Sequence, residues 1–501
     1  MNVGEQVAVI RGARVRGPGR ELLPVADADD RVDVFLSDGA IVDIAPTGVI
    51  RPAGSVLEAD GRFLLPGLWD HHVHVTQWAL ASERVSVVDA TTAVEAARRV
   101  AGSPVLADGR RVGVGFRDAL WADSPSVALL DEHTGDVPTY LINADVHSVW
   151  LNSAALRREA LSADDSGILR EAPAFEVSRR LNAVPAAHAD ALVAAMARRA
   201  AGRGVVGLVD LDMAWNEDAW VRRVAGGFDT LRVSFGIYPE HLDRAIAAGL
   251  RTGDPLRGGS DLVHVGPVKV ITDGSLGTRT AACSHPYAGS SDDRGMLTVA
   301  PAALVEMMTR ATAAGLSCAI HAIGDVANSH ALDAFALSGA TGTIEHAQLV
   351  GASDIPRFAR LGVGASVQPE HAVDDRDLTD EIWAAQTATP YPLRALADAG
   401  ATLLFGSDAP VSPLDPWAAL AAAVHRTRGG RPAWRPEQAL DPHTALAAST
   451  RGGSTDPATI RPGSPGDLVL CDSDPLAATE SELREMTVAA TLLAGRLTHL
   501  A

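Results

Sequence analysis

Eight short apolar runs, each followed by an alanine-rich amphipathic segment, constrain the fold of this chain more than any other feature. Apolar runs of this length that alternate with helical patterns are typical of βα units around a parallel sheet. Eight parallel strands close a TIM (β/α)8 barrel, so the sequence predicts an α/β fold of this kind, with functional side chains at the C-terminal strand ends. The eight runs are 63–74, 205–212, 231–238, 263–274, 317–325, 341–348, 362–369 and 401–410.

The two ends of the chain carry a different pattern of short alternating strands and turns. Neither end is long enough to bury a core alone, so we expect both to combine into one small β-sandwich. The predicted organisation is sandwich segments at 1–60 and 451–501 with the barrel at 61–450 between them. Residues 75–204 separate the first two runs, and this length predicts an inserted subdomain over the barrel mouth, because ordinary loops are much shorter.

Charge and composition restrict the partners. The formal net charge is −19 at pH 7, whereas nucleic acids and anionic membranes bind basic faces, so neither is an expected partner. The sequence has no apolar stretch of about 18 residues and no signal-peptide core at its start. The three cysteines lie far apart and suggest no disulfide framework. We therefore expect a cytoplasmic protein that acts on a small molecule, with a homodimer as the working hypothesis for its assembly.

The first run ends in Asp70-His71-His72-Val73-His74. Side chains two residues apart on a strand share a face, so His72 and His74 project together into the barrel while His71 points away. Two imidazoles placed in this way can bind one metal ion. An isolated His-x-His pattern is more often incidental, but its position at the end of the first run favours a metal site.

Three further runs end in potential metal ligands, since His321 ends CAIH, His346 ends TIEH and Asp408 ends LLFGSD. One buried histidine at a strand end is more often a core or rim residue. Three candidates at three strand ends, together with the histidine pair, indicate a common centre. This set can hold two divalent metal ions if one more anionic ligand bridges them.

Lys269 is the only lysine of the chain, and it lies in the apolar run VHVGPVKVITDG. The simplest explanation for such a residue is a structural ion pair. A buried ammonium is costly, however, and tends to lose its proton. A neutral amine can react with carbon dioxide to give a carbamate, which is an anionic ligand able to bridge two metal ions. We therefore predict that Lys269 supplies the bridge.

The ordered set of HxH, Lys, His, His and Asp on barrel strands resembles the amidohydrolase superfamily. Within it, several motifs resemble the family-3 branch, which includes N-substituted formamide deformylases. The family has Ser or Thr where this chain has His71, which is a mild departure. The motifs are LLPGLWDHHVH, DVHSVWLNSAAL, GILREA, VKVITDGSLGTRTAA, HAIGD, IEHAQ, SVQPEHAVDD and GSDAPVSPLDP, and they cover nearly the whole chain.

This resemblance implies two metal ions, with zinc favoured by the nitrogen and oxygen ligands. It assigns His72, His74, carboxylated Lys269 and Asp408 to one ion, and Lys269, His321 and His346 to the other. A water shared by two such ions has its pKa lowered to about 7, which gives hydroxide at neutral pH. Asp408 is the group expected to take the proton of that water and pass it to the leaving nitrogen.

Three residues are candidates for substrate contact. His371 follows the seventh run, Arg279 lies in GTRTAA beyond Lys269, and His147 lies in the DVHS of the insertion. Each of them can equally well have a role in packing or in a surface hydrogen bond. Asp273 is expected to be a structural turn residue rather than a ligand.

Three functions are compatible with these patterns. The preferred one is hydrolysis of an amide-type C–N bond, as in an N-substituted formamide, an N-acyl amine or a cyclic amide. The alternative is deamination of a heterocycle or hydrolysis of a lactone or ester at the same site, but deaminase relatives generally use one metal ion without the strand-four lysine. A catalytically silent scaffold is the third, and such relatives lose ligands that this chain retains.

Overall fold

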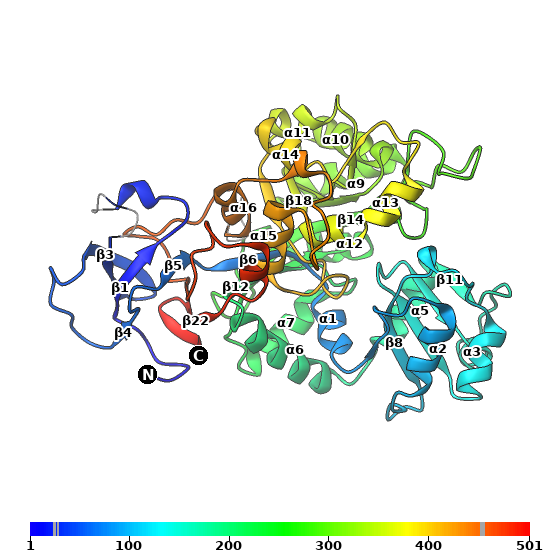
Figure 1. Ribbon diagram of the computed structural model, residues 1–501, viewed down its shortest axis with the longest axis horizontal. Helices are drawn as coiled ribbons and strands as arrows, with labels where there is room; N and C mark the ends of the chain where they lie inside the picture. Colours follow the sequence, from blue (N-terminus) through cyan, green and yellow to red (C-terminus); the bar gives the residue numbers. More distant parts are fainter. Residues whose placement is uncertain (24–26, 28–29, 451–455) are drawn as a thin grey trace.

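The computed structural model describes residues 1–23, 27, 30–450 and 456–501. Figure 1 shows three parts: a β domain that contains both chain termini at the left, a barrel in the centre, and a separate α/β unit at the lower right. The barrel carries the predicted ligands, so its strands position the candidate site.

Within the described residues, the central sheet has eight parallel strands in the order β6, β12, β13, β14, β15, β16, β18, β20. Each strand lies inside one of the eight predicted runs, which confirms the predicted TIM barrel. Their sequences are apolar because both faces of the sheet are covered. The strands are Leu68–Val73 (β6), Val205–Asp210 (β12), Arg232–Ile237 (β13), Val263–Ile271 (β14), Cys318–Ala322 (β15), Gly342–His346 (β16), Gly364–Val367 (β18) and Leu403–Phe405 (β20).

Backbone hydrogen bonds between the first strand and the segment after the last strand close the barrel. Val73 forms a parallel bridge with Ala409. The Asp408 N–H donates to the carbonyl of His72 at 2.7 Å, and the His74 N–H donates to that of Ala409 at 2.9 Å. This seam lies at the C-terminal end of both strands.

Helices cover the outside of the barrel and pack against its strands in one large hydrophobic core. One of them, α15, is buried along most of its length. The helices of this layer are α1 (Val75–Ala81), α6 (Ala186–Ala201), α7 (Asn216–Ala225), α8 (Leu242–Ala248), α9 (Pro301–Ala313), α10 (Asp325–Ser338), α11 (Ile355–Leu361), α14 (Leu393–Asp398), α15 (Pro416–His425) and α16 (Pro442–Ser449).

The strands from both ends of the chain form one mixed sheet with its own hydrophobic core. The C-terminal strand β21 pairs antiparallel with β5, and this pairing joins the two ends. Strand β1 pairs with β2 and β4 in its first half and with β5 in its second half, which lets the sheet turn a corner. The strands are Val9–Val15 (β1), Val32–Ser37 (β2), Ala40–Pro46 (β3), Val56–Glu58 (β4), Phe63–Pro66 (β5), Leu468–Cys471 (β21), Val488–Leu493 (β22) and Arg496–Leu500 (β23).

The boundaries of this β domain differ slightly from the predicted ones. Strand β5 lies beyond residue 60, so the first apolar run supplies one strand to the β domain and the next, β6, to the barrel. At the other end, residues 451–455 of the predicted segment lie outside the described residues.

The segment between β6 and β12 contains a separate five-stranded sheet with helices on both faces. It is smaller than the predicted insertion, because α1 and α6 pack in the barrel core rather than with this sheet. We call the unit at 82–185 the insertion. Its elements are β7 (Val85–Ser86), α2 (Ala93–Ala101), β8 (Arg111–Phe116), α3 (Val127–Thr134), β9 (Thr139–Asn143), β10 (Ser148–Leu151), α4 (Ser153–Glu159), β11 (Ile168–Arg170) and α5 (Ala172–Leu181).

Short elements complete the molecule. After β18 the chain forms α12 (Pro369–Asp374) and α13 (Arg376–Ile382), and β17 (Leu349–Val350) pairs with β19 (Thr389–Pro390). The last helix is α17 (Glu480–Arg484). Among the described residues, none of the helices is both long enough and apolar enough to cross a membrane.

Candidate metal centre

The six residues predicted to bind metal lie at one end of the barrel. His72 and His74 come from β6 and its end, Lys269 from β14, His321 from β15, His346 from β16, and Asp408 from the segment after β20. All six are buried. Because the strands are parallel, their C-terminal ends meet at the same mouth, as the sequence predicted.

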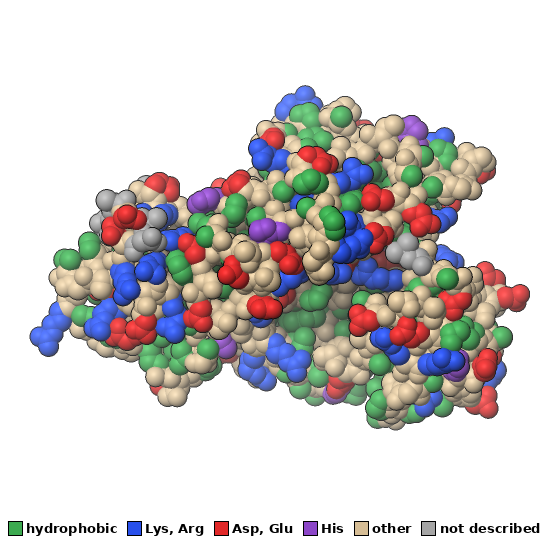
Figure 2. Space-filling view, viewed as in Figure 1, with side chains coloured by type: hydrophobic (Ala, Val, Ile, Leu, Met, Phe, Trp, Pro, Cys, Tyr) green, Lys and Arg blue, Asp and Glu red, His purple; other side chains and the backbone are tan. Residues whose placement is uncertain are grey.

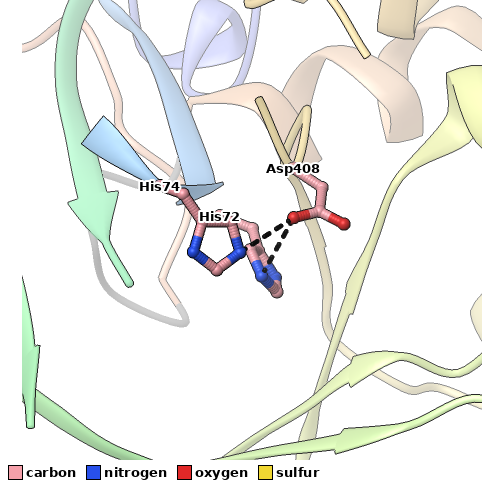
Figure 3. A group of neighbouring side chains, drawn as sticks. All are labelled: His72, His74 and Asp408. Carbon is pink, nitrogen blue, oxygen red and sulfur yellow. Dashed lines mark ion pairs between the residues drawn. The ribbon is translucent and has the colours of Figure 1, made fainter. Parts of the chain in front are cut away.

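His72, His74 and Asp408 meet at the barrel seam (Figure 3). Asp408 Oδ1 lies 3.2 Å from Nε2 of His74 and 3.5 Å from Nε2 of His72. His71 points the other way, as expected, with its Nδ1 3.0 Å from the Phe405 carbonyl. Gly406 permits this close approach, since a Cβ at that position would lie 2.7 Å from Cβ of His72.

Lys269 reaches the same cluster from β14. Its Nζ lies 3.0 Å from Nε2 of His72, and the residue is 1% exposed. Burial lowers the pKa of Lys269, against the opposing charges of Glu345 and Asp408. The only lysine of the chain therefore sits in the cluster with the histidines and Asp408, in contact with one of them.

His321 and His346 form the other side of the cluster. Their ring centroids are 4.5 Å apart, and the centroid of His346 lies 4.8 Å from that of His72. His346 has a φ of 74°, a left-handed conformation that is uncommon for a residue with a side chain. Asp408 is also left-handed, with a φ of 57°. Backbone strain of this kind tends to concentrate at functional sites.

Two groups of these ligand atoms lie close enough to hold an ion. The atoms of His72, His74 and Asp408 all lie within 4.8 Å of one another, and so do those of His346, His371 and Asp408. His371 was predicted as a substrate contact, so its place in the second group was not anticipated. His321 is not in that group, and its Nε2 lies 3.4 Å from the carbonyl of Gly274.

Two side chains that the sequence did not single out orient these histidines. Glu345 is 2% exposed and accepts a hydrogen bond from Nδ1 of His72 at 2.7 Å. Gln368 is likewise buried, with its Oε1 2.8 Å from Nδ1 of His346. Such partners fix the orientation of the ring. In His72 the other ring nitrogen, Nε2, faces Lys269 and Asp408. A glutamate inside the apolar strand TIEH is the one signal that could have identified Glu345.

The electrostatic environment favours the neutral form of His72 and His346 and the charged form of Asp408. Burial, followed by the charge of Lys269, lowers the pKa of His72 to about 4. Burial and the charge of His321 hold the pKa of His346 well below its ordinary value. Burial would raise the pKa of Asp408, but the neighbouring histidines outweigh it and hold the pKa well below its ordinary value. Neutral imidazole and carboxylate are the forms that bind metal ions.

The cluster forms the floor of a cavity of about 1040 Å³, a volume that includes the solvent space at its mouth. The insertion supplies one wall and the barrel loops the other, and Figure 2 shows the surface hollowed between these two parts. On the insertion side, Ser275 Oγ donates to Asp145 at 2.6 Å and Thr280 Oγ1 donates to Glu171 at 2.6 Å. These bonds tie the insertion to the loop after β14.

Two of the three predicted substrate contacts line this cavity, namely His147 and His371. His147 is oriented by Glu171, whose Oε2 lies 3.0 Å from its Nδ1. Arg279 does not line the cavity. It is exposed and has a left-handed φ of 57°, whereas Ser275 of the same loop lines the cavity.

The cationic residue of the cavity wall outside the cluster is Arg117 of the insertion, which the sequence analysis did not identify. It lies 3.4 Å from Asp374 and 3.8 Å from Asp375, at the junction of α12 and α13. Asp273 accepts hydrogen bonds from the backbone N–H groups of Ala282, Ile323 and Gly324, and its Oδ1 also lies 3.4 Å from Nε2 of His321.

The donor set fits a divalent metal ion. It combines neutral imidazole nitrogens with a buried carboxylate whose Oδ1 makes no hydrogen bond to any described residue. Nδ1 of buried His74 likewise has no hydrogen-bond partner within the described parts of the chain. A parallel barrel with such donors at its C-terminal mouth defines the class of metal-binding barrel enzymes.

Comparisons with known proteins agree with this class. Residues 55–499 match the family model described as "Amidohydrolase family". The chain is 26% identical to the protein LONG AFTER FAR-RED 3 of Arabidopsis thaliana, over 90% of this chain and 85% of that protein. It is 25% identical to the N-substituted formamide deformylase of Arthrobacter pascens, over 93% of this chain and 94% of that enzyme.

A solved structure of an uncharacterized metal-dependent hydrolase from Pyrococcus horikoshii OT3 is also similar. It has a TM-score of 0.78 and 25% sequence identity, and the match covers 94% of this chain and 99% of the other. The chain belongs to the amidohydrolase family and is a hydrolase. This confirms the resemblance found in the sequence motifs.

Proposed function

We propose that this protein is a metal-dependent amidohydrolase that hydrolyses an amide-type C–N bond of a small molecule. The observation that carries the proposal is the meeting of Asp408 with His72, His74 and the only lysine at the floor of the cavity. Folding of the barrel does not by itself require histidine, lysine and aspartate side chains from strands far apart in the sequence to converge at its mouth.

The proposed assignment follows the sequence prediction. His72, His74, Asp408 and carboxylated Lys269 hold one ion, while Lys269, His321 and His346 hold the other. The contact of Lys269 Nζ with His72 and the close rings of His321 and His346 support this arrangement. Zinc is the proposed metal, because the ligands are nitrogen and oxygen atoms at a site open to a cavity.

The bridge is proposed to be a carbamate on Lys269. Its neutral amine attacks carbon dioxide, a new N–C bond forms, and the nitrogen releases one proton to solvent. The product carries one negative charge over two oxygens, so each oxygen can bind a different ion. The buried position of Lys269 in an apolar strand supports this step, because an ammonium there is poorly solvated.

The residues of the chain have separate roles in the proposed reaction. When bound, the two ions lower the pKa of a water molecule to about 7 and polarise the scissile carbonyl. Asp408 accepts the proton of the attacking water and delivers it to the leaving nitrogen. Glu345 and Gln368 hold the rings of His72 and His346 in place, and the insertion limits solvent access to the cavity.

The proposed substrate is an N-substituted formamide, an N-acyl amine or a cyclic amide. The deformylase of Arthrobacter pascens, which matches along nearly its whole length, supports this class. Deamination of a heterocycle and hydrolysis of a lactone or ester are the alternatives. The presence of Lys269 in the cluster favours the amide, because deaminase relatives generally lack this lysine.

Metal analysis combined with a hydrolysis panel tests the proposal. Purified protein should contain close to two divalent ions per chain and should hydrolyse a formamide, an N-acyl amine or a cyclic amide. Removal of the ions with a chelator should abolish this activity, and zinc should restore it. A metal-loaded enzyme that releases ammonia from heterocycles and hydrolyses no amide would contradict the amide assignment.

The bridge is tested by Lys269→Ala. This variant should lose most of its metal and activity, and a short carboxylic acid should restore part of both by replacing the missing anion. Wild-type enzyme with the same acid is the control and should be unchanged. The native mass should also exceed that of the metal-loaded chain by one carbon dioxide. Full activity with two ions in Lys269→Ala would refute the bridging role.

His147 tests the role of the insertion in substrate choice. It lines the cavity at 5.8 Å, ring centroid to ring centroid, from His321. His147→Ala should change kcat/KM between substrates without changing the metal content. Trp150 is not a suitable probe, because it is fully buried in the core of the insertion. Equal effects on all substrates would argue against a role of His147 in selection.

A further inference from the structure

His371 and Gln348 form a buried polar pair in the wall of the cavity. His371 lies on α12 and Gln348 follows β16, and the two residues are 5% and 4% exposed. The proposed metal ligation and proton transfer use neither side chain. Buried polar groups are normally hydrogen-bonded, so their unpaired atoms need an explanation.

The contact between Gln348 and His371 indicates which nitrogen of the imidazole can donate a hydrogen bond. Nε2 of Gln348 lies 3.4 Å from Nδ1 of His371. An amide nitrogen only donates, so Nδ1 of the ring is the acceptor in this weak bond. With Nδ1 as the acceptor, the ring nitrogen that can donate is Nε2. That atom is buried and has no hydrogen-bond partner among the residues that the structure describes.

The ring of His371 lies beside the candidate metal centre. The ring of His371 lies nearly parallel to that of His346, with an interplanar angle of 10° and 6.3 Å between centroids. One ligand atom of His371 lies within 4.8 Å of the corresponding atoms of His346 and Asp408. The reacting group of a substrate must also lie beside Asp408 if this carboxylate moves the proton.

We propose that His371, oriented by Gln348, donates its Nε2–H to the acyl oxygen of the substrate. The inference rests on the proposed function. The hydrogen bond strengthens as negative charge develops on that oxygen, so it stabilises the transition state more than the bound substrate. No proton is transferred in this step.

This role narrows the substrate class. A donor to the acyl oxygen stabilises the transition state only if the carbon under attack carries an oxygen that accepts a hydrogen bond. Formamides, N-acyl amines, cyclic amides and lactones have such an oxygen. An aminopurine ring attacked at its amino-bearing carbon does not, so His371 favours carbonyl substrates over heterocycle deamination.

The competing role for His371 is direct metal ligation, because its ligand atom lies near those of His346 and Asp408. The two roles predict different losses. Removing a metal ligand lowers the metal content, whereas removing a hydrogen-bond donor to the substrate leaves the metal content unchanged and lowers kcat. Metal content and kinetics of the same variant therefore separate them.

The test is His371→Ala in the metal-loaded enzyme, with His443→Ala as the control because His443 is exposed on α16. We expect His371→Ala to keep its metal content and to lose about 10²–10³-fold in kcat, the usual cost of removing one donor to a developing oxyanion. Gln348→Met, which removes the orienting amide, should lose about tenfold. The control should match wild type.

A thioamide substrate distinguishes a direct contact from a structural role. Sulfur accepts hydrogen bonds weakly, so the loss in His371→Ala should fall below about tenfold when the acyl oxygen is replaced by sulfur. A structural role would give the same loss with both substrates. If His371→Ala fails to fold, His371→Gln and Gln348→Met carry the same comparison.

The outcomes separate this inference from the proposed function. Wild-type enzyme that hydrolyses no carbonyl compound refutes the proposed function and the inference with it. Active wild type together with His371→Ala within threefold in kcat refutes the inference alone. Loss of metal from His371→Ala, or equal losses with amide and thioamide, also overturns it.

Discussion

Replacing Glu345 with glutamine should weaken metal binding while leaving the fold intact. Glu345 contacts His72 and lies on the side of the imidazole away from the centre. A carboxylate in this position raises the basicity of the ligand and fixes its ring. The substitution changes one oxygen to a nitrogen and therefore probes the charge rather than the shape.

The structure sets the size of the expected effect. Oε2 of Glu345 accepts from His72 Nδ1 at 2.7 Å, and Oε1 accepts from the hydroxyl of Thr343. A glutamine can keep both contacts, with its oxygen toward His72 and its amide nitrogen toward Thr343, because a hydroxyl both donates and accepts. Only the charge is lost. Loss of such a partner typically weakens metal affinity 10- to 100-fold, or about 1.4–2.7 kcal/mol.

The assay is a competition titration of zinc against a chromophoric chelator, with the metal content measured after dialysis. Glu306→Gln is the matched control, because Glu306 is exposed on α9, away from the predicted ligands. Circular dichroism should show the same fold for both variants. An affinity of Glu345→Gln within twofold of wild type would refute the orienting role that we assign to this carboxylate.

Three further outcomes are expected. Asp408→Asn should keep much of its metal but lose about 10²-fold or more in kcat, and a loss below threefold would remove it from proton transfer. Burial raises the pKa of Asp190, but two arginines of α7 outweigh it and hold the pKa below its ordinary value. The contribution of these ion pairs to the free energy of unfolding is therefore present above the pKa of Asp190 in the unfolded chain, and it is lost as the pH falls through its pKa in the folded protein. Asp190→Asn should lower the free energy of unfolding, measured with urea, by about 1 kcal/mol at pH 7 and leave it unchanged at low pH. Gly207→Ala should lower the free energy of unfolding by about 1–3 kcal/mol, because the new Cβ would lie 2.4 Å from the ring of Trp69. An unchanged urea midpoint would show that the ring can move to make room.

The barrel could be predicted from the sequence because its strands are apolar runs with polar residues at their ends. Both faces of such strands are buried, so hydrophobicity alone marks where they begin and end. The first run was not resolved correctly, since 63–74 contains β5 and β6, which belong to different sheets. The break falls at Gly67, where a Cβ would lie 2.4 Å from Val206. That contact depends on a residue far along the chain, so local patterning cannot show it.

The candidate site was predictable to the extent that strand ends define it. His72, His74 and Asp408 lie close together because they are at the ends of parallel strands. Their separation along the sequence does not matter for this. Arg279 lies outside the cavity lining, and the sequence could not show this because it lies in a turn, where the direction of a side chain depends on backbone angles. Arg117 was missed because it belongs to the insertion, whose packing against the barrel no sequence motif encodes.

The centre and the closure of the barrel depend on the same few residues. The hydrogen bonds from Asp408 to the His72 carbonyl and from His74 to the Ala409 carbonyl join the first strand to the end of the last. The side chains of these residues face one another across the same seam. A barrel whose ends fail to meet therefore has no complete ligand set, because one histidine pair and one carboxylate come from opposite ends of the sheet. An ion held by both ends in turn stabilises the closed barrel over any open one, since it binds only where both are present. This buried polar cluster is thus placed where closure itself brings its members together.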